Sequence, residues 1–162
     1  MNICRSYKKI NYEPKYLEEL SYEIMKFHNK VGTKYFEPNM KLKTFNQKLS
    51  FFKEKTQKLI DSCQHNVIGI DDDTNRIWGF YCFRIEDGVC HNPFIFKSQD
   101  FKLCRSTFKG SFDGFNDMKK LGFDEIHTII DRKDPKRYLK FLHRYYNITA
   151  EMGDPVKVIF HI

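Results

Sequence analysis

Residues 66–96 decide the fold, and they read NVIGIDDDTNRIWGFYCFRIEDGVCHNPFIF. Three stretches rich in β-branched and aromatic residues alternate here with two short clusters of turn residues, at 71–75 and 86–88. This pattern predicts three strands joined as an antiparallel meander. Pro93 lies inside the third strand, and because proline cannot donate to a strand ladder, it predicts a bulge or an edge position there. The expected strands cover residues 66–70, 76–85 and 89–96.

Two amphipathic helices are predicted before the meander. The second covers about residues 42–60 and has one apolar side and one lysine-rich side. A short strand at residues 3–7 is expected ahead of both helices. The first helix opens beside Pro14, and its apolar residues recur at spacings of three and four: Leu17, Leu20, Ile24 and Phe27.

The chain after the meander predicts a helix, a strand, a second helix and two final strands. The second of these helices starts with Asp134 as its N-cap and Pro135 at its first helical position. The complete predicted order is β-α-α-β-β-β-α-β-α-β-β, an α+β fold whose mostly antiparallel central sheet is flanked by helices. The expected ranges are about 111–121 and 134–146 for the helices and about 125–130, 148–152 and 155–162 for the strands.

Length and composition favour a cytoplasmic protein with one domain over residues 1–162. The 162 residues are 41% hydrophobic, enough for a core of their own. We expect no membrane contact, because no apolar run approaches the roughly 18 residues that a span needs. The five cysteines form no Cys-x-x-Cys pair, which favours a reducing compartment. No metal is expected either, since the acidic run at 71–73 lacks the glycine and glutamate of a calcium loop.

The predicted order of elements resembles the GCN5-related N-acetyltransferase (GNAT) superfamily across most of the chain. In that family a Gln/Arg-x-x-Gly-x-Gly/Ala loop precedes the third helix, and its backbone N–H groups hold the pyrophosphate of acetyl-CoA. The matching stretch here is RSTFKG, at residues 105–110. Arg105 fits the first position and Gly110 the last, but Phe108 replaces the first glycine. The resemblance implies acetyl-CoA as cofactor, bound by Arg105, Phe108, Lys109, Gly110 and Ser111.

The resemblance also implies a general acid on the last helix. Many family members use a tyrosine in a Tyr-x-x-x-Gly-Phe pattern to protonate the CoA thiolate. Phe141 stands at the tyrosine position, so that hydroxyl is absent. Tyr138 and Tyr145 lie three and four residues away on the same helical side and are the candidate replacements. The alternative is that both are ordinary amphipathic residues with solvated hydroxyls.

A general base is expected at the third meander strand, where the family often places one. The attacking amine must be neutral, and an imidazole or carboxylate can take its proton. His91 and Glu86 are the candidates in this region. The alternatives are a histidine that only accompanies the strand bulge and a glutamate that only belongs to a hairpin turn.

Three functions compete at this stage. The first is an N-acyltransferase that moves acetyl from acetyl-CoA to an amine of a small molecule or a protein. The second is a catalytically inactive GNAT-like scaffold with a structural or interaction role, for example in a virus or phage, and Phe108 and Phe141 favour it. The third is nucleic-acid binding through the lysines of residues 41–58 in a chain of net charge +7. It is less favoured, because the aromatic residues of that helix are expected on its apolar side.

Overall fold

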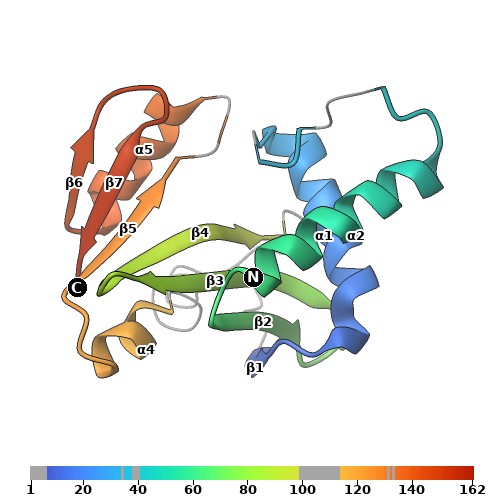
Figure 1. Ribbon diagram of the computed structural model, residues 1–162, viewed down its shortest axis with the longest axis horizontal. Coiled ribbons are helices and arrows are strands. Elements are labelled where there is room, and N and C mark those ends of the chain that lie inside the picture. The colour runs from blue at the N-terminus through green and yellow to red at the C-terminus, as the bar shows by residue number, and fades with distance from the viewer. Residues whose placement is uncertain (1–6, 34, 38–40, 99–113, 131, 133) are drawn as a thin grey trace, which may run out of the picture.

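A seven-stranded sheet organises the part of the chain that the structure describes (Figure 1). The structure is a computed structural model, and it describes every residue except 1–6, 34, 38–40, 99–113, 131 and 133. The strand order is β1-β2-β3-β4-β5-β7-β6, and every neighbouring pair is antiparallel except β4 and β5. The strands are β1 (Tyr7–Asn11), β2 (His65–Asp71), β3 (Ile77–Glu86), β4 (Val89–Lys97), β5 (Glu125–Ile129), β6 (Ile148–Glu151) and β7 (Lys157–His161).

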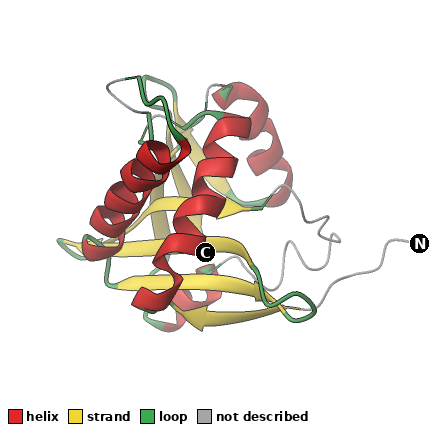
Figure 2. Ribbon diagram, turned by 90° about the vertical axis from the view of Figure 1, so that its right-hand side faces the viewer, coloured by secondary structure: helices red, strands yellow, loops and turns green. Residues whose placement is uncertain are grey.

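Helices flank the strands of this sheet (Figure 2). The first two pack on each other beside the N-terminal strands, and the last one lies against β5 and β7 (Figure 1). The predicted element order and the mostly antiparallel sheet are confirmed, and so is the α+β class. The helices are a short 3-10 turn η1 (Pro14–Tyr16), α1 (Leu17–Val31), α2 (Phe45–Asp61), α4 (Phe115–Lys120) and α5 (Pro135–Tyr145).

Side-chain caps fix the starts of two helices, and the sequence predicted one of them. The Asp134 side chain accepts a hydrogen bond from the backbone N–H of Arg137, at 3.3 Å, so it caps α5 as predicted. In α2 the predicted start is three residues early. Thr44 and Gln47 form a reciprocal capping box with bonds of 3.1 and 3.2 Å, which fixes the first helical residue at Phe45.

Two other predicted elements are described only in part. Of the strand expected at residues 3–7, residues 3–6 lie outside the described residues, and the described strand is Tyr7–Asn11, where Ile10 packs against the core and pairs with Ile68 of β2. Of the helix expected over 111–121, residues 111–113 also lie outside the described residues, and the described helix α4 begins at Phe115. Gly114 precedes it with φ of +43°, a left-handed conformation that ends the helix there. A Cβ on Gly114 would lie 2.6 Å from the Tyr81 ring, so the close contact also requires glycine.

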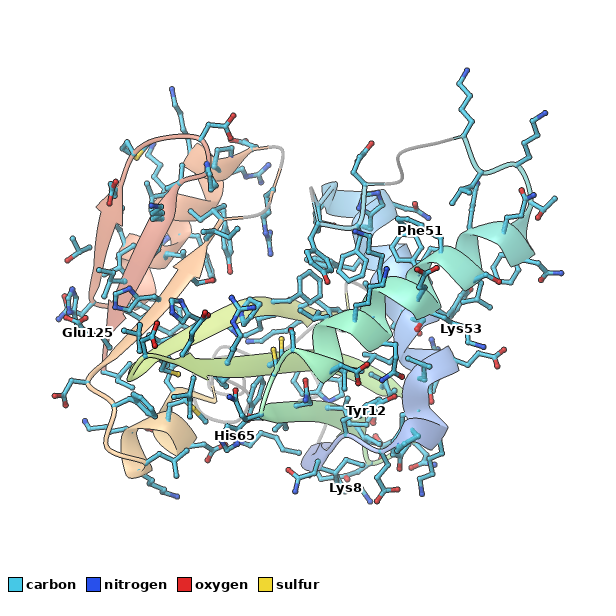
Figure 3. The ribbon with its side chains drawn as sticks, viewed as in Figure 1. Lys8, Tyr12, Phe51, Lys53, His65 and Glu125 are labelled. Atoms are coloured by element: carbon cyan, nitrogen blue, oxygen red, sulfur yellow. The ribbon has the colours of Figure 1, made fainter. Side chains whose placement is uncertain are left out.

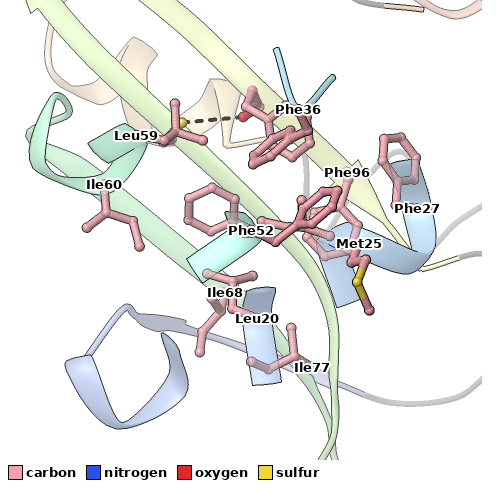
Figure 4. Close-up of a cluster of buried hydrophobic side chains, with 14 of the residues drawn as sticks. Leu20, Met25, Phe27, Phe36, Phe52, Leu59, Ile60, Ile68, Ile77 and Phe96 are labelled. Carbon is pink, nitrogen blue, oxygen red and sulfur yellow. Dashed lines mark hydrogen bonds between the residues drawn. The ribbon is translucent and has the colours of Figure 1, made fainter. Parts of the chain in front are cut away.

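Apolar side chains form one cluster on each face of the sheet. Successive residues of β3 alternate between the clusters, with Cys82 on the α1 and α2 face and Tyr81 on the opposite face. Phe36, from the connection between α1 and α2, is fully buried in the first cluster. Its ring stacks on that of Phe52 of α2, with ring centres 5.4 Å apart (Figure 4). It also meets the ring of Phe94 of β4 edge-on, at 5.1 Å. This contact joins both N-terminal helices to the centre of the sheet.

The bulge predicted from Pro93 is present in β4. Cys82 pairs with Phe94 and Arg84 pairs with His91, so β4 has one residue more than β3 in this interval. The Asn92 side chain, which is 3% exposed, stabilises the bulge. Its Nδ2 donates to the carbonyl oxygens of Cys82 and Phe94, at 2.7 and 3.2 Å.

We expect the substitution Asn92→Ala to lower the free energy of unfolding by about 2–3 kcal/mol, because it leaves buried carbonyl groups without this donor. Urea denaturation of the full chain measures the change. Asn116→Ala is the matched control, since Asn116 is exposed on α4, and we expect a change within about 0.5 kcal/mol. Equal losses in the two variants would contradict a structural role for Asn92.

Candidate active site

Strands β4 and β5 form a parallel pair only near their beginnings. The paired positions are Cys90 with Ile126 and His91 with His127. Just beyond them, Thr128 Oγ1 donates to the Asn92 carbonyl oxygen at 2.7 Å. The two strands then point in different directions (Figure 1). We call the residues that follow His91 on β4 and His127 on β5 the β4–β5 fork. Strand edges that leave a ladder can bind an extended ligand through their backbone groups.

His91 lies at the base of the fork, beside the bulge. Its ring meets the His127 ring edge-on, with ring centres 5.9 Å apart. Burial lowers the pKa of His91 below its usual 6.5, and the charges of Arg84 and His127 lower it further, while Glu86 opposes them. The net lowering favours the neutral imidazole at pH 7, which is the form that a general base requires.

A series of polar contacts continues from His127 across β7 to β6. His127 Nε2 lies 3.1 Å from the carboxylate of Glu125, which lies at the end of the sheet away from α2 (Figure 3). The same carboxylate is 3.8 Å from His161 Nδ1, and His161 Nε2 lies 2.7 Å from Thr149 Oγ1. Sequence reasoning missed this group, because its members come from strands that are not consecutive. The only available signal was the alternate spacing of Glu125 and His127 on one strand.

Glu86 lies at the hairpin end of β3 and not in the fork. Its side chain is 61% exposed, and its carboxylate lies 3.4 Å from Arg84 Nε. Its Cα partner is Val89, at the first position of β4. Glu86 is therefore the last residue of β3, directly before the turn, and its negative charge raises the pKa of His91.

Tyr138 and Tyr145 lie on one side of α5 with Phe141 between them. The Tyr138 and Phe141 rings are stacked at 6.0 Å, and the Phe141 and Tyr145 rings are 4.8 Å apart. Tyr138 is in the first turns of α5, next to the segment that leaves β5, whereas Tyr145 is its last residue. Burial raises the pKa of Tyr138, so its phenol keeps its proton at neutral pH. The two tyrosines are thus at opposite ends of the helix.

The loop that is expected to bind acetyl-CoA lies outside the described residues. This holds for Arg105, Phe108, Lys109, Gly110 and Ser111. Their assignment to acetyl-CoA stays a prediction.

Two lysines on the lysine-rich side of α2 contact other side chains of the same helix. Lys58 Nζ lies 2.9 Å from Glu54 Oε1, and Lys55 Nζ lies 6.0 Å from the centre of the Phe51 ring. Lys53 projects from the other side of the helix from Phe51 (Figure 3). Two of the lysines therefore already have partners on the helix, which favours a solvated surface.

The aromatic residues of α2 differ in how deeply they are buried. Phe52 is buried in the core, whereas Phe45, the first residue of α2, is 56% exposed and packs edge-on against Tyr22 of α1, at 6.1 Å. Nucleic-acid binding stays a prediction, and salt-sensitive retention on a polyanion resin would test it.

Two other kinds of site are not found within the described ranges. No helix there is long and apolar enough to cross a bilayer. Nor does that part of the chain contain three or more His, Cys, Asp or Glu side chains arranged to hold a metal ion.

Solved acetyltransferase structures are similar to the chain over nearly its whole length. The PaiA N-acetyltransferase of Thermoplasma acidophilum, in complex with coenzyme A, has a TM-score of 0.64 and 12% identity, covering 97% of this chain and 99% of that chain. For a GNAT-family acetyltransferase of Staphylococcus aureus the values are 0.59, 12%, 96% and 99%. For the ribosomal-protein-S5-alanine acetyltransferase of Vibrio fischeri they are 0.61, 10%, 95% and 91%.

The chain therefore has the GNAT fold, as the order of its predicted elements indicated. No protein-family model matches its sequence, and no curated protein matches it either. The similarity thus lies in the arrangement of the elements and not in their side chains, so the roles of individual residues must be argued from the site itself.

The electrostatics of the fork give a first prediction for His91. Arg84→Gln should raise the pKa of His91, because it removes a positive charge that disfavours the imidazolium form. Glu86→Gln should lower that pKa, because it removes a negative charge that favours the imidazolium form. A proton NMR titration of the His91 ring measures both shifts, with the exposed His143 as internal control. Two shifts of the same sign would contradict this account.

Proposed function

We propose that the chain is an N-acyltransferase that transfers an acetyl group from acetyl-CoA to an amine. The main support is the separation of β4 and β5 directly after the His91 and His127 pair, next to a bulge that Asn92 stabilises. A solved structure with this fold is a complex with coenzyme A. When bound, acetyl-CoA supplies the activated thioester, and its extended pantetheine arm suits the separated strand edges.

In this proposal the chain's own residues move two protons. His91 accepts a proton from the attacking amine, since its lowered pKa keeps it unprotonated. Tyr138 donates a proton to the thiolate that leaves when the C–S bond breaks, since burial keeps its phenol protonated. Tyr145 is the less favoured acid, because it lies at the far end of α5. His91 is on β4, and Tyr138 is on α5, the helix that follows β5.

A second candidate is the inactive scaffold. Phe141 at the family's tyrosine position favours it, because a phenylalanine has no hydroxyl to donate a proton. A catalytically inactive protein would keep the fold and the bulge in β4 but would not bind acetyl-CoA. Binding of acetyl-CoA therefore distinguishes the two candidates.

Calorimetric titration of the full chain with acetyl-CoA tests the proposal. We expect saturable binding with a dissociation constant between about 1 μM and 1 mM, together with thiol release when a primary amine is added. The double substitution Arg105→Gln, Gly110→Trp should abolish binding, while Gly153→Trp, in an exposed turn, should not. Absence of wild-type binding at millimolar acetyl-CoA would leave the scaffold as the better candidate.

A further inference from the structure

Arg132 lies close to two aromatic rings, one from α1 and one from α5. Its guanidinium carbon is 3.8 Å from the ring centre of Tyr138, on α5, and 5.5 Å from that of Phe27, on α1. Phe27 packs in turn against Phe94 and Phe96 of β4, with ring centres 6.1 and 5.5 Å away. Because Arg132 follows β5 in the chain, its side chain reaches from the β5 side of the fork toward the β4 side.

The contacts of Arg132 differ from those of Arg76 and Arg84. Arg76 lies 3.0 Å from Glu23, and Arg84 lies 3.4 Å from Glu86. Within the described residues, Arg132 makes neither an ion pair nor a hydrogen bond, and its guanidinium lies against two aromatic rings. Ring contacts leave the five N–H donors of a guanidinium free in its plane, in the fork geometry that matches a carboxylate or a phosphate.

The stacked position also restricts the motion of the Arg132 side chain. A long, flexible side chain loses rotamer freedom when it binds a ligand, and the two rings impose part of that loss beforehand. Tyr138 and Phe27 therefore hold a cation with available donors in one place beside the fork. Such an arrangement is suited to bind an anion, because charge-assisted and bidentate hydrogen bonds are among the strongest polar contacts.

We propose that Arg132 binds an anionic group on the acyl acceptor, so that the acceptor is an amine that also carries a carboxylate or a phosphate. The proposal rests on the acyl transfer proposed above. Acetyl-CoA is expected on the face of the sheet that holds α4, because the residues expected to bind it, 105–111, precede that helix. Phe27 belongs to α1, on the opposite face of the sheet. An amine that reaches the thioester from the α1 face would therefore pass Arg132.

Matched pairs of amines test this assignment with the full chain. O-phosphoethanolamine is compared with ethanolamine, and β-alanine with propylamine, at saturating acetyl-CoA. We expect the wild type to prefer the anionic member of each pair by about tenfold to a hundredfold in kcat/KM. Arg132→Gln should remove that preference through KM, and Arg132→Lys should retain part of it. Arg137→Gln, an exposed arginine on α5, is the control and should keep the full preference.

A second measurement separates this inference from the proposed function. The NMR signal of the Arg132 Nε–H group, identified by its loss in Arg132→Gln, should shift when O-phosphoethanolamine is added without acetyl-CoA. A shift without any acetyl transfer would support the anion site and overturn the acyltransferase proposal. Transfer without preference and without a shift would overturn the anion site alone. Weaker acetyl-CoA binding in Arg132→Gln, with the acceptor preference unchanged, would assign Arg132 to the carrier's phosphates and also overturn the inference.

Discussion

Replacing Phe36 by alanine is expected to lower the free energy of unfolding by about 3–5 kcal/mol, the range for a large aromatic side chain removed from a packed core. Phe36 is fully buried. Its ring touches Phe52 of α2 and Phe94 of β4, at 5.4 and 5.1 Å. The cavity would therefore open where the connection between α1 and α2 meets the strand that carries the bulge.

Phe45→Ala is the matched control for this loss. It also removes a phenylalanine side chain, but from the first position of α2, where Phe45 is 56% exposed. Among the ring contacts of the described residues, Phe45 has one, with Tyr22. We expect a change within about 1 kcal/mol. Urea denaturation of both variants gives the comparison, and a loss below about 1 kcal/mol in Phe36→Ala would show that the cluster collapses to refill the space.

The Phe36 cluster also links stability to the fork. Phe94 lies directly after the bulge, and its carbonyl oxygen accepts a hydrogen bond from Asn92, at 3.2 Å. A shift of Phe94 into the cavity would therefore disturb the strand that forms one side of the site. We infer that apolar packing on the α1 and α2 face holds β4 in its bent course, while the bulge fixes where the bend occurs.

Local signals in the sequence predicted the fold well. Pro93 indicated the bulge, because a proline inside an apolar strand pattern cannot donate to the ladder. Asp134 and Pro135 indicated the start of α5, because an N-cap acceptor and a proline at the first position favour a helix. These effects act over a few residues, so the sequence alone contains them.

The site depends on contacts between distant residues, and the sequence could not specify them. Thr128 bonds to Asn92 across 36 positions, and Arg132, in the connection between β5 and α5, reaches Phe27 on α1. Neither pair has a periodic pattern, since each arises from the sheet order in which β5 lies next to β4. Gly114 shows the same limit on a smaller scale, because its close contact is with rings on β3, which are distant in the sequence.

The largest expected effect on activity belongs to His91→Asn. This variant keeps a polar side chain of similar size but cannot act as a base near pH 7. We expect kcat/KM to fall by about 100-fold to 1,000-fold with the amine that the wild type acetylates fastest, within the usual range for loss of a general base. Affinity for acetyl-CoA should not change, since His91 is proposed to act on the amine.

The pH dependence separates a base from a residue that only supports the fold. In the wild type, kcat/KM should fall as the pH drops through the pKa of His91, which lies below 6.5, because the imidazolium form cannot accept a proton. His91→Asn should lose this acidic limb, and His143→Asn, an exposed position on α5, should keep both the limb and the rate. A limb that persists in His91→Asn, or a fall of less than about threefold, would exclude His91 as the base. His127 would then be the group to test next, because its ring lies 5.9 Å from that of His91 at the base of the same fork and its Nε2 lies 3.1 Å from the Glu125 carboxylate.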